Sequence, residues 1–236
     1  MAFSGAEDFD LLEKGFDKLT LPGKPVKPET RAVILDLLKK YIREIELFNE
    51  AYGLVKAADR NELIVRHILD SMAVLQKLNA GNPEWEAAGK IADVGSGAGL
   101  PGIPLAICMP ETGFTLIERM GRRAGFLRNC AAVLGLDNVR IEETDMEKAA
   151  PAEFDIAVFR AFRPLTPDIL KSLLRLVHPR GILAAWKGRF ENARDEMLAA
   201  EKSVPGLKWK IEPMEVPFLD EQRNLVLIEK PAGVEG

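Results

Sequence analysis

The first third of the chain carries apolar residues at helical spacing. Between Pro28 and about Tyr52 they recur at steps of three and four residues, and proline suits the first turn of a helix. A second stretch of this kind begins near Asp59, which has the spacing of a capping box with Glu62. We therefore expect residues 1–85 to form an N-terminal helical extension.

From residue 89 onward, short apolar runs alternate with segments of helical periodicity. This alternation is typical of parallel strands joined by helical crossovers. The last two extended runs, within residues 207–230, have no helix between them, so we expect them to form an antiparallel hairpin. The pattern predicts an α/β domain over residues 86–236, with a mostly parallel sheet and a C-terminal antiparallel hairpin. The other predicted strands cover residues 90–95, 113–118, 138–143, 154–160 and 181–188.

Composition narrows the class of protein. Apolar residues make up 47% of the chain and charged residues 29%, which is ordinary for a globular domain. The N-terminus carries acids where a signal peptide would carry positive charge, and no apolar run approaches the ~20 residues of a membrane span, so we expect a cytoplasmic protein. Two cysteines and two histidines offer no zinc-ligand spacing, and we expect no metal. The net charge of −4 argues against coating nucleic acid by charge alone.

A glycine-rich segment, DVGSGAGLPGIP (93–104), follows the first predicted strand. Ligands of open parallel sheets bind at the carboxyl ends of the strands. Glycine adopts positive φ and has no Cβ to obstruct a ligand, and a tight turn alone does not require so many glycines. The segment therefore predicts a ligand site.

Two ligands fit this segment. Read from Gly97, GAGLPG matches the dinucleotide pattern G-x-G-x-x-G, with Glu118 as the following acid, which would indicate an NAD-binding oxidoreductase or a redox sensor. Read from Asp93, the acid before Gly95, Gly97 and Gly99 is typical of S-adenosylmethionine (SAM) methyltransferases, in which Glu118 would bind the ribose hydroxyls. Asp93, the C-terminal hairpin and the lack of a second substrate domain favour SAM. The expected architecture is the class I SAM-dependent methyltransferase (Rossmann-like) fold, with the dinucleotide reading as the alternative.

Several segments, in this order and spacing, resemble one family. They are RHILDS (66–71), DVGSGAGLPGIPLAI (93–107), FTLIERMGRRAGFLR (114–128), RAF (160–162) and WKG (186–188). The chain resembles the RsmG (GidB) family of bacterial methyltransferases from about residue 45 onward. The resemblance implies that SAM is used to methylate N7 of a guanine in 16S ribosomal RNA, and that the partner is this RNA or the small ribosomal subunit.

The resemblance also implies particular site residues. It implies SAM contacts at Gly95, Leu100, Met146 and Glu147, and it places Arg160 beside the methyl-transfer site. We expect Arg160 to contact the periphery of SAM, the guanine O6 or a phosphate. Phe159 stands where the family usually has serine, which leaves open a SAM-binding module that has lost catalysis.

The chemistry implied for the site needs few catalytic groups. Guanine N7 has an in-plane lone pair and no proton, so it attacks the methyl group without a general base, and the enzyme mainly orients the reactants. We therefore expect His67 to be structural. Lys187, at the end of a predicted strand, is a second catalytic candidate beside Arg160. We expect a monomer that binds RNA through a rim of cations at the strand ends. The predicted rim comprises Arg119, Arg122, Arg123, Arg128, Arg163, Lys187 and Arg189.

Overall fold

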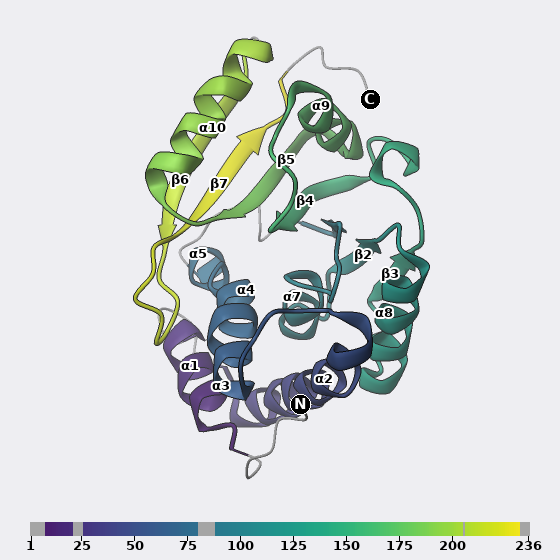
Figure 1. Ribbon diagram of the computed structural model, residues 1–236, viewed down its shortest axis with the longest axis vertical. Coiled ribbons are helices and arrows are strands. Elements are labelled where there is room, and N and C mark those ends of the chain that lie inside the picture. Colours follow the sequence, from purple (N-terminus) through teal and green to yellow (C-terminus); the bar gives the residue numbers. More distant parts are fainter. Residues whose placement is uncertain (1–7, 21–25, 80–87, 205, 232–236) are drawn as a thin grey trace.

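A computed structural model describes residues 8–20, 26–79, 88–204 and 206–231. Their strands form one seven-stranded sheet in the order β3-β2-β1-β4-β5-β7-β6 (Figure 1). The first five strands pair in parallel, whereas β7 pairs antiparallel with both β5 and β6. This confirms the mostly parallel sheet with a C-terminal antiparallel hairpin. The strands are β1 Lys90–Val94, β2 Gly113–Ile117, β3 Val139–Glu142, β4 Phe154–Arg160, β5 Val177–Lys187, β6 Lys208–Met214 and β7 Arg223–Glu229.

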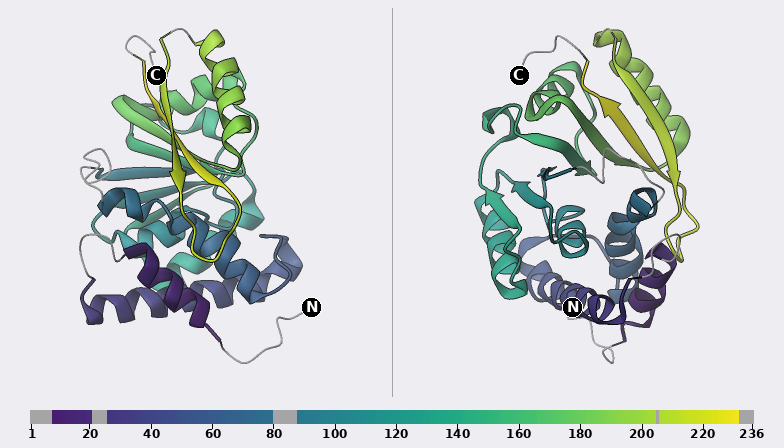
Figure 2. Two further views of the ribbon diagram at one scale, coloured as in Figure 1. Left: turned by 90° about the vertical axis from the view of Figure 1, so that its left-hand side faces the viewer. Right: turned by 180° about the vertical axis from the view of Figure 1, so that it is seen from behind.

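Helices cover both faces of the sheet. Helices α9 and α10 lie on one face, and α7, α8 and the N-terminal helices lie on the other (Figures 1 and 2). The domain helices are α7 Gly102–Cys108, α8 Gly121–Leu134, the 3-10 turn η2 Met146–Lys148, α9 Pro167–Leu176 and α10 Phe190–Ser203. The N-terminal elements are α1 Asp10–Thr20, α2 Pro28–Tyr52, α3 Arg60–Leu63, the π-helical turn η1 Ile64–Leu69, α4 Asp70–Met72 and α5 Leu75–Asn79. Among the described residues, no helix is long and apolar enough to cross a membrane.

Helix α2 has the bounds predicted from the sequence. Pro28 opens it, and Gly53 follows its last residue in the left-handed conformation (φ +58°), which closes the helix. Its apolar face is buried, and the Tyr41 hydroxyl donates to the carbonyl of Ala98 at 2.6 Å. The N-terminal extension therefore reaches the glycine-rich loop directly.

The predicted helix beyond Asp59 is instead divided into short pieces. It begins as expected, since the Asp59 carboxylate accepts the Glu62 amide at 2.8 Å and Glu62 accepts the Ala58 amide at 2.6 Å. The chain then widens into the π-helical turn η1 before α4. Such turns occur frequently at functional sites, and apolar periodicity alone does not reveal them.

The N-terminal helices and the sheet share one hydrophobic core. Buried side chains from α1, α2 and α8, including Phe16, Tyr41 and Phe126, belong to a single cluster that extends to the face of β1. The division into an extension and a methyltransferase domain remains a prediction, and the extension packs as part of the same body.

Strand β5 begins at Val177, four residues before its predicted start at Gly181. The intervening His178 and Pro179 are typical of a turn. Here His178 Nε2 lies 2.8 Å from Asp155 Oδ1 on the neighbouring β4, and the register between the two strands is irregular at this point. The side-chain contact across the sheet keeps this segment extended.

Candidate active site

The glycine-rich loop leaves β1 at the carboxyl edge of the sheet. Gly95, Gly97 and Gly99 all have positive φ (70°, 58° and 91°), which side-chain-bearing residues rarely adopt. A Cβ added at Gly97 would have only the Gly95 carbonyl oxygen within 4 Å, at 3.8 Å. The loop therefore leaves open space at Gly97 for a ligand.

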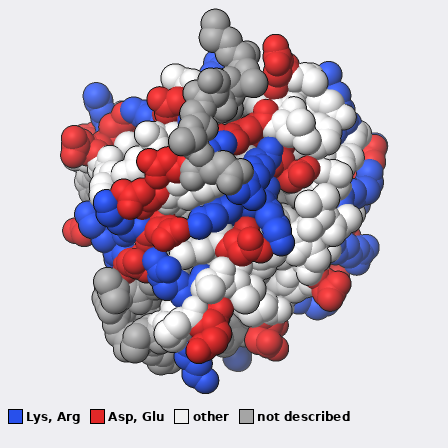
Figure 3. Space-filling view, turned by 90° about the horizontal axis from the view of Figure 1, so that it is seen from below, with Lys and Arg blue, Asp and Glu red and all other residues white. Residues whose placement is uncertain are grey.

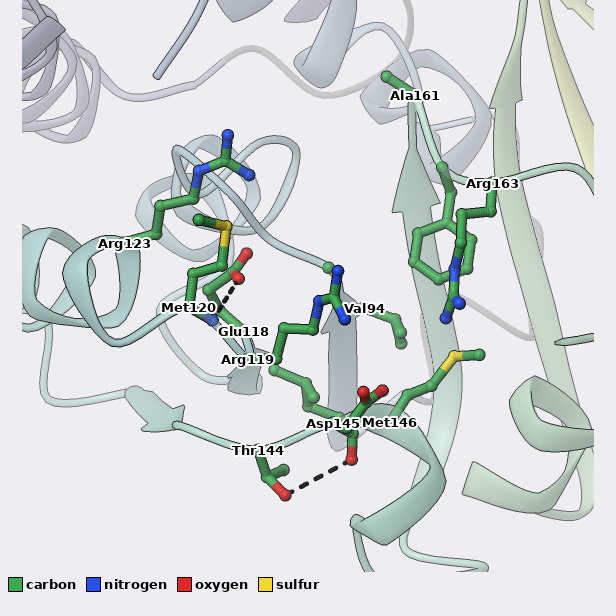
Figure 4. A pocket seen from close by; sticks show the side chains of 13 residues that line it. Val94, Glu118, Arg119, Met120, Arg123, Thr144, Asp145, Met146, Ala161 and Arg163 are labelled. Atoms are coloured by element: carbon green, nitrogen blue, oxygen red, sulfur yellow. Dashed lines mark hydrogen bonds between the residues drawn. The ribbon is translucent and has the colours of Figure 1, made fainter. Parts of the chain in front are cut away.

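Glu118 holds this loop from the end of β2. The side chain is buried, and one carboxylate oxygen accepts the Gly97 amide at 2.9 Å. The other oxygen accepts the Met120 amide at 2.8 Å (Figure 4). A carboxylate has about four acceptor positions, so both oxygens retain capacity to accept hydroxyl donors. This geometry suits the ribose-binding role predicted for Glu118.

A cavity of about 210 Å³ opens beside Glu118. Its apolar lining includes Val94, Ile117 and Met146, and its charged lining includes three arginines and two acids. In the view of Figure 4, Arg123 and Arg163 stand on opposite sides, with Arg119 and Asp145 between them. The complete lining is Val94, Gly95, Ile117, Glu118, Arg119, Met120, Arg123, Thr144, Asp145, Met146, Ala161, Phe162 and Arg163.

Phe162 forms one wall of the cavity. A Cβ added at Gly95 would lie 2.8 Å from Phe162 Cε2, so the ring lies directly against the glycine backbone. Ala161 adopts φ +50°, a left-handed conformation unusual for alanine, and this turns the chain from β4 towards the glycine loop. The ring also packs against Phe159, with centroids 5.7 Å apart, and Arg163 lies over it at 5.4 Å.

Among the predicted cofactor residues of the glycine-rich segment, Gly95 lines the cavity, whereas Asp93, Gly97, Gly99 and Leu100 do not. Asp93 Oδ2 accepts the Gly102 amide at 3.0 Å, whereas Oδ1 has no hydrogen-bond partner among the described residues. Burial raises the pKa of Asp93 to about 7. A Cβ on Gly102 would lie 2.5 Å from Leu116 Cδ2 and 2.6 Å from Asp93 Oδ2. Helix packing against the sheet therefore accounts for Gly102, the last glycine of the dinucleotide pattern.

The other predicted cofactor residues lie after β3. Met146 is buried and lines the cavity, whereas Glu147 pairs with Arg163 at 3.5 Å outside it. Sequence reasoning did not single out Asp145, Thr144 or Met120, which also line the cavity. The signal for Asp145 was its place directly before Met146. The pKa of Asp145 is lowered, and the largest cause is a hydrogen bond with Glu147. The positive charges of Arg119 and Arg163 lower it further.

The two predicted catalytic residues are both held by carboxylates and do not line the cavity. Arg160 Nη1 lies 2.8 Å from Asp70 Oδ2 in the N-terminal extension. Lys187 Nζ lies 2.7 Å from Glu196 Oε2, and Glu196 Oε1 accepts the Leu165 amide at 2.9 Å. Lys187 therefore stabilises the segment after Phe162 indirectly, because it pairs with the carboxylate that binds the Leu165 amide.

The predicted cationic rim is only partly free to bind RNA. Arg128 pairs with Glu143 at 2.8 Å, and Arg122 lies over the Tyr52 ring at 5.2 Å. Arg119, Arg163 and Arg189 are exposed, and of these Arg163 pairs with Glu147 at 3.5 Å. The face seen in Figure 3, formed by the N-terminal helices, carries interspersed cations and acids, and several of them are ion-paired. The exposed Arg119 and Arg189 are therefore the members of the predicted rim that we expect to contact RNA.

His67, in the turn η1 of the N-terminal extension, contacts Arg160 at the end of β4 and is neutral. Arg160 Nη2 approaches His67 Nδ1 at 2.9 Å, and since a guanidinium only donates, Nδ1 accepts. The ring proton is then on Nε2, which donates to the Lys56 carbonyl at 3.1 Å. Burial is the largest cause that lowers the pKa of His67 below 6.5, and the charge of Arg160 is the second. Together they outweigh the hydrogen bond to the Lys56 carbonyl and the charges of Asp70 and Glu62, which raise it.

Acid is expected to destabilise the protein through His67. The unfolded chain binds a proton on this residue at about pH 6.5, whereas the folded chain resists protonation, so its contribution is full above that pH and is lost as the pH falls through the folded-state pKa. Urea unfolding at pH 7 and pH 5 measures the effect. The free energy of unfolding should fall more in the wild type than in His67→Gln, and equal decreases in both would contradict this assignment.

The cavity fits SAM in three respects. Glu118 offers a carboxylate with spare acceptor capacity, Gly95 brings the loop backbone to the cavity with open space beside Gly97, and Ile117 and Met146 supply an apolar surface for an adenine. The acids Glu118 and Asp145 complement a sulfonium cation, and the cavity arginines complement a carboxylate or a phosphate.

Comparisons with known proteins agree on a single family. The family model described as "GidB: rRNA small subunit methyltransferase G" matches residues 34–226. "Ribosomal RNA small subunit methyltransferase G" of Treponema denticola is 38% identical, covering 94% of this chain and 96% of that protein. The protein of the same name from Bordetella pertussis is 35% identical, covering 83% and 85%.

Solved structures share the fold at low sequence identity. The [4+2]-cyclase SpnF is 16% identical with a TM-score of 0.57, and the match covers 89% of this chain and 99% of that one. A putative O-methyltransferase from Klebsiella pneumoniae is 17% identical with a TM-score of 0.54, covering 94% and 96%. At these identities the likeness concerns the fold alone.

Proposed function

This chain belongs to the ribosomal RNA small subunit methyltransferase G family, and on that premise we propose that it transfers a methyl group from SAM to N7 of a guanine in 16S ribosomal RNA. The observation that carries the proposal is the family match over residues 34–226, which spans the glycine loop, Glu118 and Arg160. The dinucleotide alternative has no support from the family model or from the named relatives.

The reaction needs orientation more than proton transfer. When bound, SAM supplies an electrophilic methyl group on a positively charged sulfur. The N7 lone pair of guanine forms the new N–C bond as the S–C bond breaks, and the positive charge passes from sulfur to the guanine. No proton moves, so no general base is required, and in-line alignment dominates the rate.

The chain's own residues divide the tasks of binding and alignment. Glu118 accepts the ribose hydroxyls of SAM while it holds the Gly97 amide. Phe162 limits the cavity on the side of β4, and its ring offers an aromatic face near the reacting centre. Arg119 and Arg163 place positive charge at the cavity for an RNA phosphate or the carboxylate of SAM.

We expect the protein to act in the cytoplasm, because ribosomal RNA is its proposed substrate. We also expect it to be active as a monomer. The support for this expectation is that Glu118, Met146 and Phe162, from three separate strand ends, line one cavity without a residue from a second copy being needed for the proposed contacts. Sedimentation of the active protein at assay concentration tests this, and activity confined to a larger species would contradict it.

RNA binding is expected to weaken steeply with salt. If Arg119 and Arg189 each neutralise one phosphate, KM for RNA should rise roughly tenfold between 50 and 200 mM salt. Arg119→Gln should reduce the logarithmic salt slope by about 0.7. Lys40→Gln, whose lysine pairs with Asp36 within helix α2, serves as the control and should leave the slope unchanged. A flat response in the wild type would contradict an electrostatic rim.

The proposed function is tested by mapping the methyl group. Small subunits, or their RNA, from cells lacking this enzyme are incubated with the protein and labelled SAM, and 7-methylguanine is located by borohydride and aniline cleavage. Cleavage at one new guanine supports the proposal. Label without cleavage would overturn the N7 assignment, and SAM binding without label would indicate a binding module that has lost catalysis.

A further inference from the structure

A buried carboxylate joins the N-terminal extension to the ends of three strands. Asp70 is only 2% exposed. Its Oδ2 lies 2.8 Å from Arg160 Nη1 at the end of β4, and its Oδ1 lies 3.0 Å from Arg223 Nε at the start of β7. Its backbone carbonyl accepts Trp186 Nε1, near the end of β5, at 3.0 Å. One residue thus contacts β4, β5 and β7 at the edge where the cavity lies.

Arg160 is held on several sides. Besides Asp70, its Nη1 donates to the Arg66 carbonyl at 3.1 Å and its Nη2 donates to His67 Nδ1 at 2.9 Å. Arg66 and His67 belong to the π-helical turn η1, and Asp70 follows directly after it. The side chain is 15% exposed. This set of acceptors fixes the guanidinium and with it the last residue of β4.

The segment after Arg160 forms the wall of the cavity. Ala161 takes its left-handed conformation directly after Arg160, and the Phe162 ring then lies against Gly95. The far end of the segment is tied by the Leu165 amide to Glu196. Residues 161–164 are therefore held at both ends, by Arg160 before them and by Leu165 after them. The carboxylate of Asp70 fixes the position of Arg160.

We propose that Asp70 is a positioning residue for methyl transfer, which acts through Arg160 on the Phe162 wall. The proposal rests on the methyltransferase function proposed above. It predicts a selective effect, because the ribose-binding contacts of Glu118 come from β2 and the glycine loop and do not involve Asp70. Loss of the Asp70 charge should misplace the wall, and a misplacement of about 1 Å can cost on the order of 100-fold in rate.

The test compares Asp70→Asn with Asp155→Asn. Asp155 is also hydrogen-bonded, to the Gly89 and Lys90 amides and to His178, but it lies at the opposite end of β4. In Asp70→Asn, kcat should fall roughly 100-fold while the Kd for SAM changes less than about threefold. Hydrogen exchange in a peptide covering residues 159–166 should accelerate. Asp155→Asn should retain both kcat and the exchange rate of that peptide.

A second variant covers the case in which Asp70→Asn does not fold. Arg160→Lys keeps the positive charge, but a single ammonium does not reproduce the planar fork that contacts Asp70, Arg66 and His67 together. It should show the same loss of kcat and the same faster exchange. Unchanged exchange, or unchanged kcat in either folded variant, would overturn the positioning role.

Failure of the proposed function gives a different result. In that case the wild type itself methylates no ribosomal RNA, and the exchange measurement alone decides whether Asp70 fixes the segment after Arg160. Weakening of SAM binding by the same factor as kcat would also overturn the proposal, because it would place Asp70 in general support of the cofactor site.

Discussion

Glu118→Ala is expected to weaken SAM binding by at least roughly 100-fold. Hydrogen bonds to a charged acceptor contribute about 1.5–3 kcal/mol each, so the loss of two ribose contacts corresponds to this change in Kd. The substitution also leaves the Gly97 and Met120 amides without their acceptor. Both effects act on the same side of the cavity. Isothermal titration with SAM and with its demethylated product measures the loss.

The control for this prediction is Glu111→Ala. Glu111 is an exposed acid just before β2, at the opposite edge of the sheet from Glu118. The Glu111→Ala variant should bind SAM with the affinity of the wild type. Circular dichroism should show that both variants are folded. SAM affinity in Glu118→Ala within a few fold of the wild type would remove Glu118 from the cofactor site.

Gly102→Ala is expected to lower the free energy of unfolding by about 3 kcal/mol. The new Cβ would meet Leu116 Cδ2 at 2.5 Å and Asp93 Oδ2 at 2.6 Å. Overpacking of this kind typically costs about 1–3 kcal/mol. The shift needed to relieve it also strains the 3.0 Å hydrogen bond from the Gly102 amide to Asp93, which adds to the loss. Urea unfolding at pH 8 measures the change.

Gly125→Ala provides a matched comparison with the opposite sign. Gly125 lies within α8, and a Cβ there would meet nothing within 4 Å. Alanine is about 1 kcal/mol more favourable than glycine inside a helix, so this variant should be more stable than the wild type. If Gly102→Ala were equally well tolerated, close packing would not be the reason for glycine at that position.

The sequence predicted those features that depend on local patterns. Apolar periodicity and Pro28 predicted α2 with its observed bounds. The absence of a helical segment between the last two predicted strands predicted the antiparallel hairpin of β6 and β7. Glycine spacing and an acid at the next strand end assigned Glu118 and the glycine loop to one site, and the structure brings the two together through the Gly97 amide. These features could be predicted because each depends on a few residues close together or on the general geometry of parallel sheets.

The arrangement around Arg160 could not be predicted in the same way. Its partners Arg66, His67 and Asp70 lie 90 to 94 residues earlier in the chain. Arg66 and His67 also belong to a π-helical turn that apolar spacing does not reveal. RHILDS was recognised as a motif, but a motif does not identify its partners. The contact of Phe162 with Gly95 likewise depends on an unusual backbone conformation at Ala161, which nothing in the local composition indicates.

The place of β7 inside the sheet has a consequence for how the protein forms during synthesis. This strand is late in the sequence, yet it lies between β5 and β6, and its first residue, Arg223, pairs with Asp70 from 153 positions earlier. A nascent chain still lacking β7 has an open edge on β5 and an Asp70 with one of its two arginine partners. We expect the catalytic edge to mature in one late step, after the ribosome has translated residue 229. The ribosome that makes this enzyme therefore has to translate β7 before the chain can act on ribosomal RNA.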